Sequence, residues 1–134
     1  MRMKLHFVGV GKMGLPMARH LAAAGHSVTV SDPSLERCQL ARAQGQEVST
    51  SPAAAMAAAE VVLSSLPNDA ALLAVAAQVA AHAHVGAIYV DTSTVSLQAS
   101  AEAAQALAAK GVLYLRCTVS GNNKMAEAAQ LTVM

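Results

Sequence analysis

Short apolar runs alternate with helical stretches along the whole chain, which is the pattern of an α/β protein. Buried strands are expected at residues 3–8 and 60–66. In the second of these, the continuous apolar run Val61, Val62 and Leu63 is expected to be buried on both faces of the sheet. Further strands are expected at 27–31, 46–49, 87–90 and 112–115. Helices are expected between them, at 14–24, 34–43, from Pro52 onward, at 70–83 and at 96–110. Short connections require parallel strands joined by right-handed crossovers. The pattern therefore predicts a Rossmann-type doubly wound parallel sheet with strand order 3-2-1-4-5-6.

A glycine-rich turn follows the first predicted strand. Gly9 permits the sharp bend, Gly11 leaves room for a pyrophosphate beside the backbone, and Gly14 allows the next helix to pack closely on the strand. The start of that helix offers unpaired N–H groups and the positive end of a dipole to the phosphates. Asp32, eighteen positions after Gly14, stands where a carboxylate accepts hydrogen bonds from the adenosine ribose. This order predicts a dinucleotide site formed by Gly9, Val10, Gly11, Lys12, Met13, Gly14 and Asp32.

Three further turns follow predicted strands, at Leu66-Pro67, Ser93-Thr94 and Ser120-Gly121. Because the strands are expected to be parallel, their carboxyl ends meet at one edge of the sheet, where ligands bind at the switch point of the strand order. We therefore expect these three turns to lie along the same edge as the glycine turn.

Composition narrows the function classes. The 134 residues have a net charge of +1 with scattered Lys and Arg, which argues against nucleic acid as a partner. Cys38 and Cys117 are too few for a disulfide framework and favour a reducing cytoplasm. The N-terminus lacks the apolar core of an export signal, and residues 70–81 are too short to span a bilayer, so no membrane association is expected. His82 and His84 have no acid or cysteine cluster nearby, and no metal site is expected.

The order of these motifs resembles that of the β-hydroxyacid dehydrogenase family, which includes 3-hydroxyisobutyrate, tartronate semialdehyde and 6-phosphogluconate dehydrogenases. The resemblance covers essentially the whole chain. It is carried by residues 9–21, Leu66-Pro67, Asp91-Thr-Ser-Thr94, and Val119-Ser120-Gly121 with Ala126 and Leu131-Thr132. It implies an oxidoreductase that transfers hydride between a nicotinamide cofactor and a small 3-hydroxy acid or its aldehyde or ketone.

The resemblance also implies roles for single residues. Leu66, Pro67 and Thr94 would contact the cofactor. The substrate would be held by Ser93, Ser120, Gly121 and Asn122. Asn122 stands where the family has a glycine, but its side-chain amide can donate to a substrate carboxylate.

Other departures from the family pattern concern the substrate and the catalytic acid. Leu97 replaces a proline, Cys117-Thr118 replace Ala-Pro, and Ala129 replaces a glycine, which leaves an imine-reductase-like enzyme as an alternative. The family's catalytic lysine lies on a long helix in a second, helical domain. Residues 1–134 are therefore expected to be an N-terminal dinucleotide-binding domain without the helical domain, with no catalytic residue in this chain and the lysine expected beyond Met134.

Asp32 indicates NAD rather than NADP as the cofactor. A 2'-phosphate about 4 Å from this carboxylate would be repelled by about 4 kcal/mol at an effective dielectric near 20. Pro33 offers no compensating charge, although Arg37 lies one turn into the next helix and could bend back. A non-catalytic NAD-binding or regulatory module remains an alternative to the enzyme. For the enzyme, a homo-oligomer formed through the missing helical domain is expected.

Overall fold

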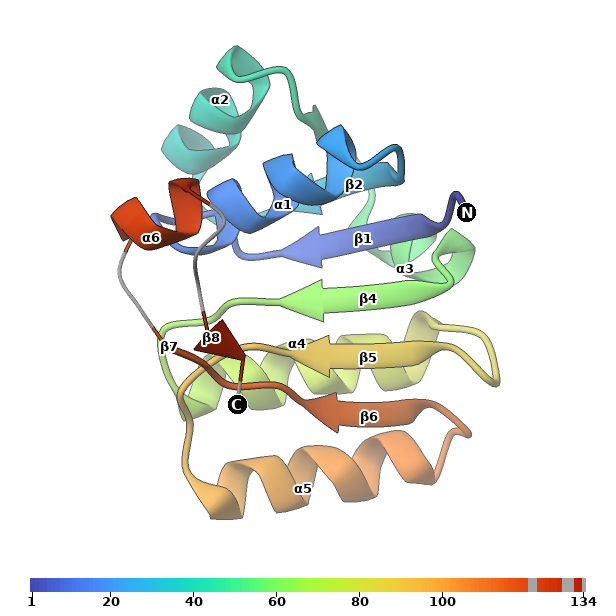
Figure 1. Cartoon of the computed structure of the whole chain (residues 1–134). Helices are drawn as coiled ribbons and strands as arrows, with labels where there is room; N and C mark the ends of the chain where they lie inside the picture. The colour runs from blue at the N-terminus through green and yellow to red at the C-terminus, as the bar shows by residue number, and fades with distance from the viewer. Residues whose placement is uncertain (121–122, 129–131, 134) are drawn as a thin grey trace.

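The computed structural model describes residues 1–120, 123–128 and 132–133, and within them six parallel strands form one sheet in the order β3-β2-β1-β4-β5-β6 (Figure 1). The strands are β1 (Lys4–Val8), β2 (Ser27–Ser31), β3 (Glu47–Val48), β4 (Val61–Ser64), β5 (Ile88–Asp91) and β6 (Leu113–Arg116). The helices between them are α1 (Gly14–Ala23), α2 (Leu35–Ala43), α3 (Pro52–Ala58), α4 (Asp69–His82) and α5 (Leu97–Ala108). The predicted Rossmann-type fold and strand order are confirmed.

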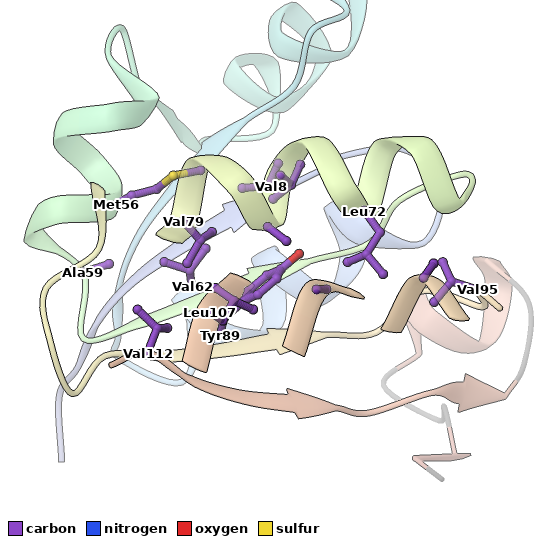
Figure 2. Close-up of a cluster of buried hydrophobic side chains, with 14 residues drawn as sticks. Val8, Met56, Ala59, Val62, Leu72, Val79, Tyr89, Val95, Leu107 and Val112 are labelled. Carbon is purple, nitrogen blue, oxygen red and sulfur yellow. The ribbon is translucent and has the colours of Figure 1, made fainter. Parts of the chain in front are cut away.

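Each face of the sheet has its own core. On one face α3, α4 and α5 cover a cluster that includes Met56, Val62, Leu72, Tyr89 and Leu107, shown in Figure 2. On the other face α1 and α2 cover a smaller cluster around Leu5, Phe7, Leu15, Val30 and Ala41. Because β1 lies at the centre of the sheet, its residues after Lys4 are buried on both faces, as its apolar run predicts.

The second face is not covered along its whole width. Val61 and Leu63 point to this face and are only half-buried. The prediction that the run Val61, Val62 and Leu63 is buried on both faces of the sheet is therefore wrong for this face. Pairing of β4, β5 and β6 aligns Leu63 with Val90 and Leu115 across this face, and Leu113 and Leu115 are exposed. Among the described residues, α1 and α2 stop at the β1 and β2 side, and no helix lies in front of β5 and β6 in Figure 1.

Side chains cap the starts of four helices. The capping oxygens of Ser34, Ser51, Asn68 and Ser96 each accept an N–H from the first turn of α2, α3, α4 and α5. Gly25 and Gly45 follow the ends of the first two helices, with φ values of +100° and +84°. Such left-handed values end a helix and are rarely adopted by residues other than glycine. The capping role predicted for Ser51 ahead of Pro52 is confirmed.

The last described part of the chain contains elements that the sequence pattern did not predict. β7 (Val119–Ser120) pairs antiparallel with β8 (Thr132–Val133), and the short helix α6 (Asn123–Glu127) lies against α1. The imidazole of His20 on α1 lies 2.9 Å from the carbonyl oxygens of Ala126 and Glu127. No described helix has the length and apolar character needed to cross a membrane.

Candidate dinucleotide-binding site

The glycine turn between β1 and α1 is tightly packed at two of its three glycines. Gly9 has φ +93°, and a Cβ there would collide with the carbonyl oxygen of Ser65. A Cβ on Gly14 would collide with the carbonyl oxygen of Gly9. Gly11 differs, because a Cβ there would meet only the guanidinium of Arg37, at 3.5 Å. Gly9 and Gly14 are therefore required by the fold, whereas the space beside Gly11 is bounded by the side chain of Arg37, which is flexible and exposed and can make room for a ligand.

The start of α1 is the point of this turn that suits an anion. Its N-cap residue, Met13, makes no side-chain cap, unlike the cap residues of α2 to α5. The first N–H groups of α1 and the positive end of its dipole therefore have no side-chain acceptor. Phosphate oxygens are acceptors of the kind that this helix end binds.

Asp32 lies directly after β2 and joins the glycine turn to the start of α2. Its Oδ2 accepts the N–H of Val10 at 3.0 Å, and its Oδ1 accepts the N–H of Ser34 at 2.8 Å. Each carboxylate oxygen has a further lone pair for a ribose hydroxyl. The sequence predicted the position of Asp32 but not these two backbone contacts.

Arg37 covers the carboxylate of Asp32. Its Nη1 lies 3.7 Å from Oδ2 of Asp32, and the side chain of Asp32 is only 2% exposed whereas that of Arg37 is 54% exposed. A ribose can therefore reach Asp32 only after the guanidinium moves aside. The half-exposed ion pair is weak, at about 0–1 kcal/mol, so a ligand can displace it.

A cavity of about 840 Å³ opens beside the glycine turn. Its lining includes Val10, Gly11, Lys12, Ser34 and Arg37, which come from the turn, the start of α1 and the start of α2. The volume is within the range of about 300–1,000 Å³ that small-molecule and cofactor sites occupy. The cavity thus borders the predicted phosphate-binding turn, and Ser34 and Arg37, which contact the carboxylate of Asp32, lie on its wall, although Asp32 itself does not line it.

The turns after β4 and β5 lie next to each other at the same edge. Leu66 is half-buried, and its N–H donates to Oγ of Ser93 at 2.7 Å. Pro67 and Thr94 are exposed, whereas Ser93 is only 4% exposed. The structure therefore brings together the two turns that the family resemblance assigns to the cofactor, with Ser93 between them.

The remaining predicted residues are placed less fully. Ser120 belongs to β7, whereas Gly121 and Asn122 lie outside the described residues. Lys12 is exposed in the turn. Within the described ranges, no group of three or more His, Cys, Asp or Glu side chains is arranged to hold a metal ion.

Together the fold and this edge of the sheet define a dinucleotide-binding domain of the Rossmann type. Comparison with known proteins gives the family. The sequence profile of the NAD-binding domain of 6-phosphogluconate dehydrogenase matches residues 4–134, and the chain belongs to this family.

Relatives and solved structures agree with this family. A probable 3-hydroxyisobutyrate dehydrogenase of Mycobacterium tuberculosis is 36% identical over 128 residues, which are 96% of this chain and 44% of the relative. The 2-(hydroxymethyl)glutarate dehydrogenase of Eubacterium barkeri is 34% identical over 134 residues, which are 98% of this chain and 44% of the relative. The solved structure of M. tuberculosis 3-hydroxyisobutyrate dehydrogenase with L-serine has a TM-score of 0.95 and 35% identity, covering 100% of this chain and 46% of the other. The chain thus spans less than half the length of these relatives.

Proposed function

We propose that this chain is the cofactor-binding part of a dehydrogenase that acts on a small 3-hydroxy acid or its aldehyde or ketone. The observation that carries the proposal is the arrangement around the cavity, which is lined by the glycine turn and the uncapped start of α1. The carboxylate of Asp32 lies behind this lining, bonded to the N–H of Val10 and paired with Arg37, both of which line the cavity. The bound nicotinamide supplies the hydride chemistry. The chain itself binds and orients the dinucleotide.

The residues divide the cofactor between them. Backbone N–H groups of the turn and of the start of α1 would hold the pyrophosphate, and Asp32 would accept the ribose hydroxyls. Leu66, Pro67 and Thr94 would contact the nicotinamide half at the ends of β4 and β5. The proposed cofactor-binding set is therefore Gly9, Val10, Gly11, Lys12, Met13, Gly14, Asp32, Leu66, Pro67 and Thr94.

Several features of the complete enzyme are part of the same proposal. The substrate carboxylate would be held near Ser120, Gly121 and Asn122. The catalytic lysine would come from a helical domain of the kind that the longer relatives have room for, and oligomers would form through that domain. A cytoplasmic location is supported by Cys38 and Cys117, both of which are free thiols.

The experiment that tests cofactor binding is a parallel titration of this chain with NADH and NADPH, followed by nicotinamide fluorescence. We expect NADH to bind at least about tenfold more tightly than NADPH. A tenfold preference needs only about 1.4 kcal/mol, and the Coulomb repulsion between the 2'-phosphate of NADPH and Asp32 is about 4 kcal/mol. Asp32→Ala should weaken NADH binding by about 10-fold to 100-fold, the range for a lost hydrogen bond to a charged group. Glu102→Ala, on the exposed side of α5, is the matched control and should leave both affinities unchanged.

Arg37 gives a second arm of the titration. Arg37→Gln removes the ion pair that competes with the ribose, so NADH should bind equally well or tighter. The same change removes a cation near the 2'-phosphate, so NADPH should bind more weakly. Failure of wild-type protein to bind either cofactor would contradict the proposed function.

A further inference from the structure

One hydroxyl connects the two turns at the carboxyl ends of β4 and β5. Oγ of Ser93 accepts the N–H of Leu66 at 2.7 Å, across a separation of 27 residues in the chain. Ser93 is buried, at 4% exposure, so water does not compete effectively for this contact. The position of Leu66 therefore depends on how Ser93 is oriented.

Asp91, the last residue of β5, orients the hydroxyl of Ser93. Oγ of Ser93 donates to Oδ1 of Asp91 at 2.6 Å, and Oγ of Ser64 donates to the same oxygen at 2.7 Å. The hydroxyl of Tyr89 lies 2.6 Å from Oγ of Ser64 and must be the donor there, because the proton of Ser64 is directed to Asp91. Burial raises the pKa of Tyr89 far above its usual value, so this donor stays protonated. The hydroxyls of Ser93 and Ser64 thus both donate to one oxygen of the fully buried Asp91 carboxylate, and Tyr89 fixes the hydroxyl of Ser64.

This arrangement uses the hydrogen-bonding capacity of Ser93 that a substrate would need. A serine hydroxyl has one proton to donate and two lone pairs to accept with. The proton is directed to Asp91 and one lone pair is taken by Leu66. The remaining lone pair cannot bind a substrate carboxylate, because a carboxylate requires a donor.

We propose that Ser93, oriented by Asp91, is a positioning residue that holds the Leu66-Pro67 turn in place for the cofactor, and that it does not donate to the substrate. The role of the turn in cofactor binding rests on the proposed function above. The role of Ser93 in fixing the backbone of Leu66 rests only on the hydrogen bonds of this chain.

The test measures amide hydrogen exchange by NMR in wild type and Ser93→Ala. Loss of the acceptor should speed exchange at Leu66 by at least about 10-fold, since about 1.4 kcal/mol corresponds to a factor of ten. The neighbouring amide of Ser65 bonds to the carbonyl oxygen of Val8 at 3.0 Å and should keep its protection. Ser27→Ala, at the opposite end of the sheet, is the matched control and should change neither amide.

A conservative change separates positioning from a general loss of structure. Asp91→Asn keeps a carbonyl oxygen where Oδ1 stands, and its amide nitrogen replaces Oδ2, which has no partner among the described residues. This variant should retain the protection of Leu66 to within a few-fold. Unchanged exchange at Leu66 in Ser93→Ala would overturn the positioning role.

The cofactor arm uses the same variants in the NADH titration. Ser93→Ala should weaken NADH binding by up to about 10-fold, because the cofactor must then order a turn that Ser93 holds in the wild type, at a cost of up to about 1.4 kcal/mol. Asp91→Asn should bind nearly as well as wild type. If Ser93→Ala frees Leu66 but leaves NADH affinity unchanged, the link between the turn and the cofactor is overturned. If wild type does not bind NADH, the proposed function and that link fail together, and the exchange data alone decide the positioning role.

Discussion

His6 makes the stability of the fold depend on pH. It lies within β1 and is fully buried, with Nδ1 2.7 Å from Oγ1 of Thr29 and Nε2 2.9 Å from Oγ of Ser31. These hydroxyls can serve either protonation state of the ring, so burial is the dominant effect. It lowers the pKa of His6 from 6.5 to about 4. At neutral pH the ring is therefore uncharged in the folded chain and mostly uncharged in the unfolded chain.

Acidification shifts the balance toward the unfolded chain. Between pH 6.5 and about 4 the unfolded chain binds a proton at His6 and the folded chain does not. The free energy of unfolding therefore decreases as the pH is lowered through that window. At about 1.4 kcal/mol for each pKa unit, the loss amounts to about 3 kcal/mol. The contribution is complete only well above pH 6.5 and is lost as the pH approaches 4.

Urea unfolding followed by circular dichroism, at a series of pH values across this window, measures the effect. His6→Gln keeps polar atoms near Thr29 and Ser31 but does not titrate, so it removes the contribution of His6 and leaves those of the other groups. The free energy of unfolding of wild type should fall by about 3 kcal/mol more than that of the variant. Equal pH dependence of the two proteins would refute the reasoning.

The glycine turn and the open sheet face lead to two further predictions. Gly14→Ala should lower the free energy of unfolding by more than about 3 kcal/mol, because the added methyl clashes with the carbonyl oxygen of Gly9. Gly11→Ala should stay within about 1 kcal/mol of the wild-type stability. It should nevertheless weaken NADH binding at least about 10-fold, because its methyl occupies the space of the pyrophosphate. Thermal unfolding and the NADH titration measure both, and wild-type affinity in Gly11→Ala would contradict this role. The exposed apolar face should cause self-association in sedimentation experiments, weakened by Leu115→Lys but not by Leu35→Lys on α2. A strictly monomeric wild type at high concentration would contradict this expectation.

Periodicity and turn chemistry were enough to predict the sheet. The alternation of apolar runs and helical segments, together with the rule for parallel crossovers, predicted the observed strand order. Local signals such as Ser51-Pro52 and Gly25 also predicted helix ends, because the physical cause lies within a few residues of the signal. The half-burial of Val61 and Leu63 could not be predicted in this way, because it depends on which elements cover that face.

The contacts of the site were less accessible from the sequence. The position of Asp32 was predictable from its spacing, but the ion pair with Arg37 depends on the side-chain direction one turn into α2. The hydrogen bond from Leu66 to Ser93 depends on β4 and β5 being neighbours and on the proton of Ser93 being directed to Asp91. The motif Asp91-Thr-Ser-Thr94 contained the necessary side chains but did not show which of them were already satisfied. Short segments such as α6 lacked a periodic pattern long enough to predict.

The two ends of the candidate site differ in how far they are prepared before a ligand arrives. At the ends of β4 and β5 the loops are already joined, by Ser93 to Leu66 and by the N–H of Ser96 to Oδ1 of Asp69 at 2.9 Å, so little backbone freedom remains to be lost there. At the end of β2, Arg37 must leave Asp32. Exposed side chains change rotamer within picoseconds to nanoseconds, far faster than a dinucleotide and a protein meet at micromolar concentrations. Arg37 therefore lowers the affinity of the site for the cofactor, because its guanidinium competes with the ribose for the carboxylate of Asp32. It does not slow the association of the cofactor with the protein.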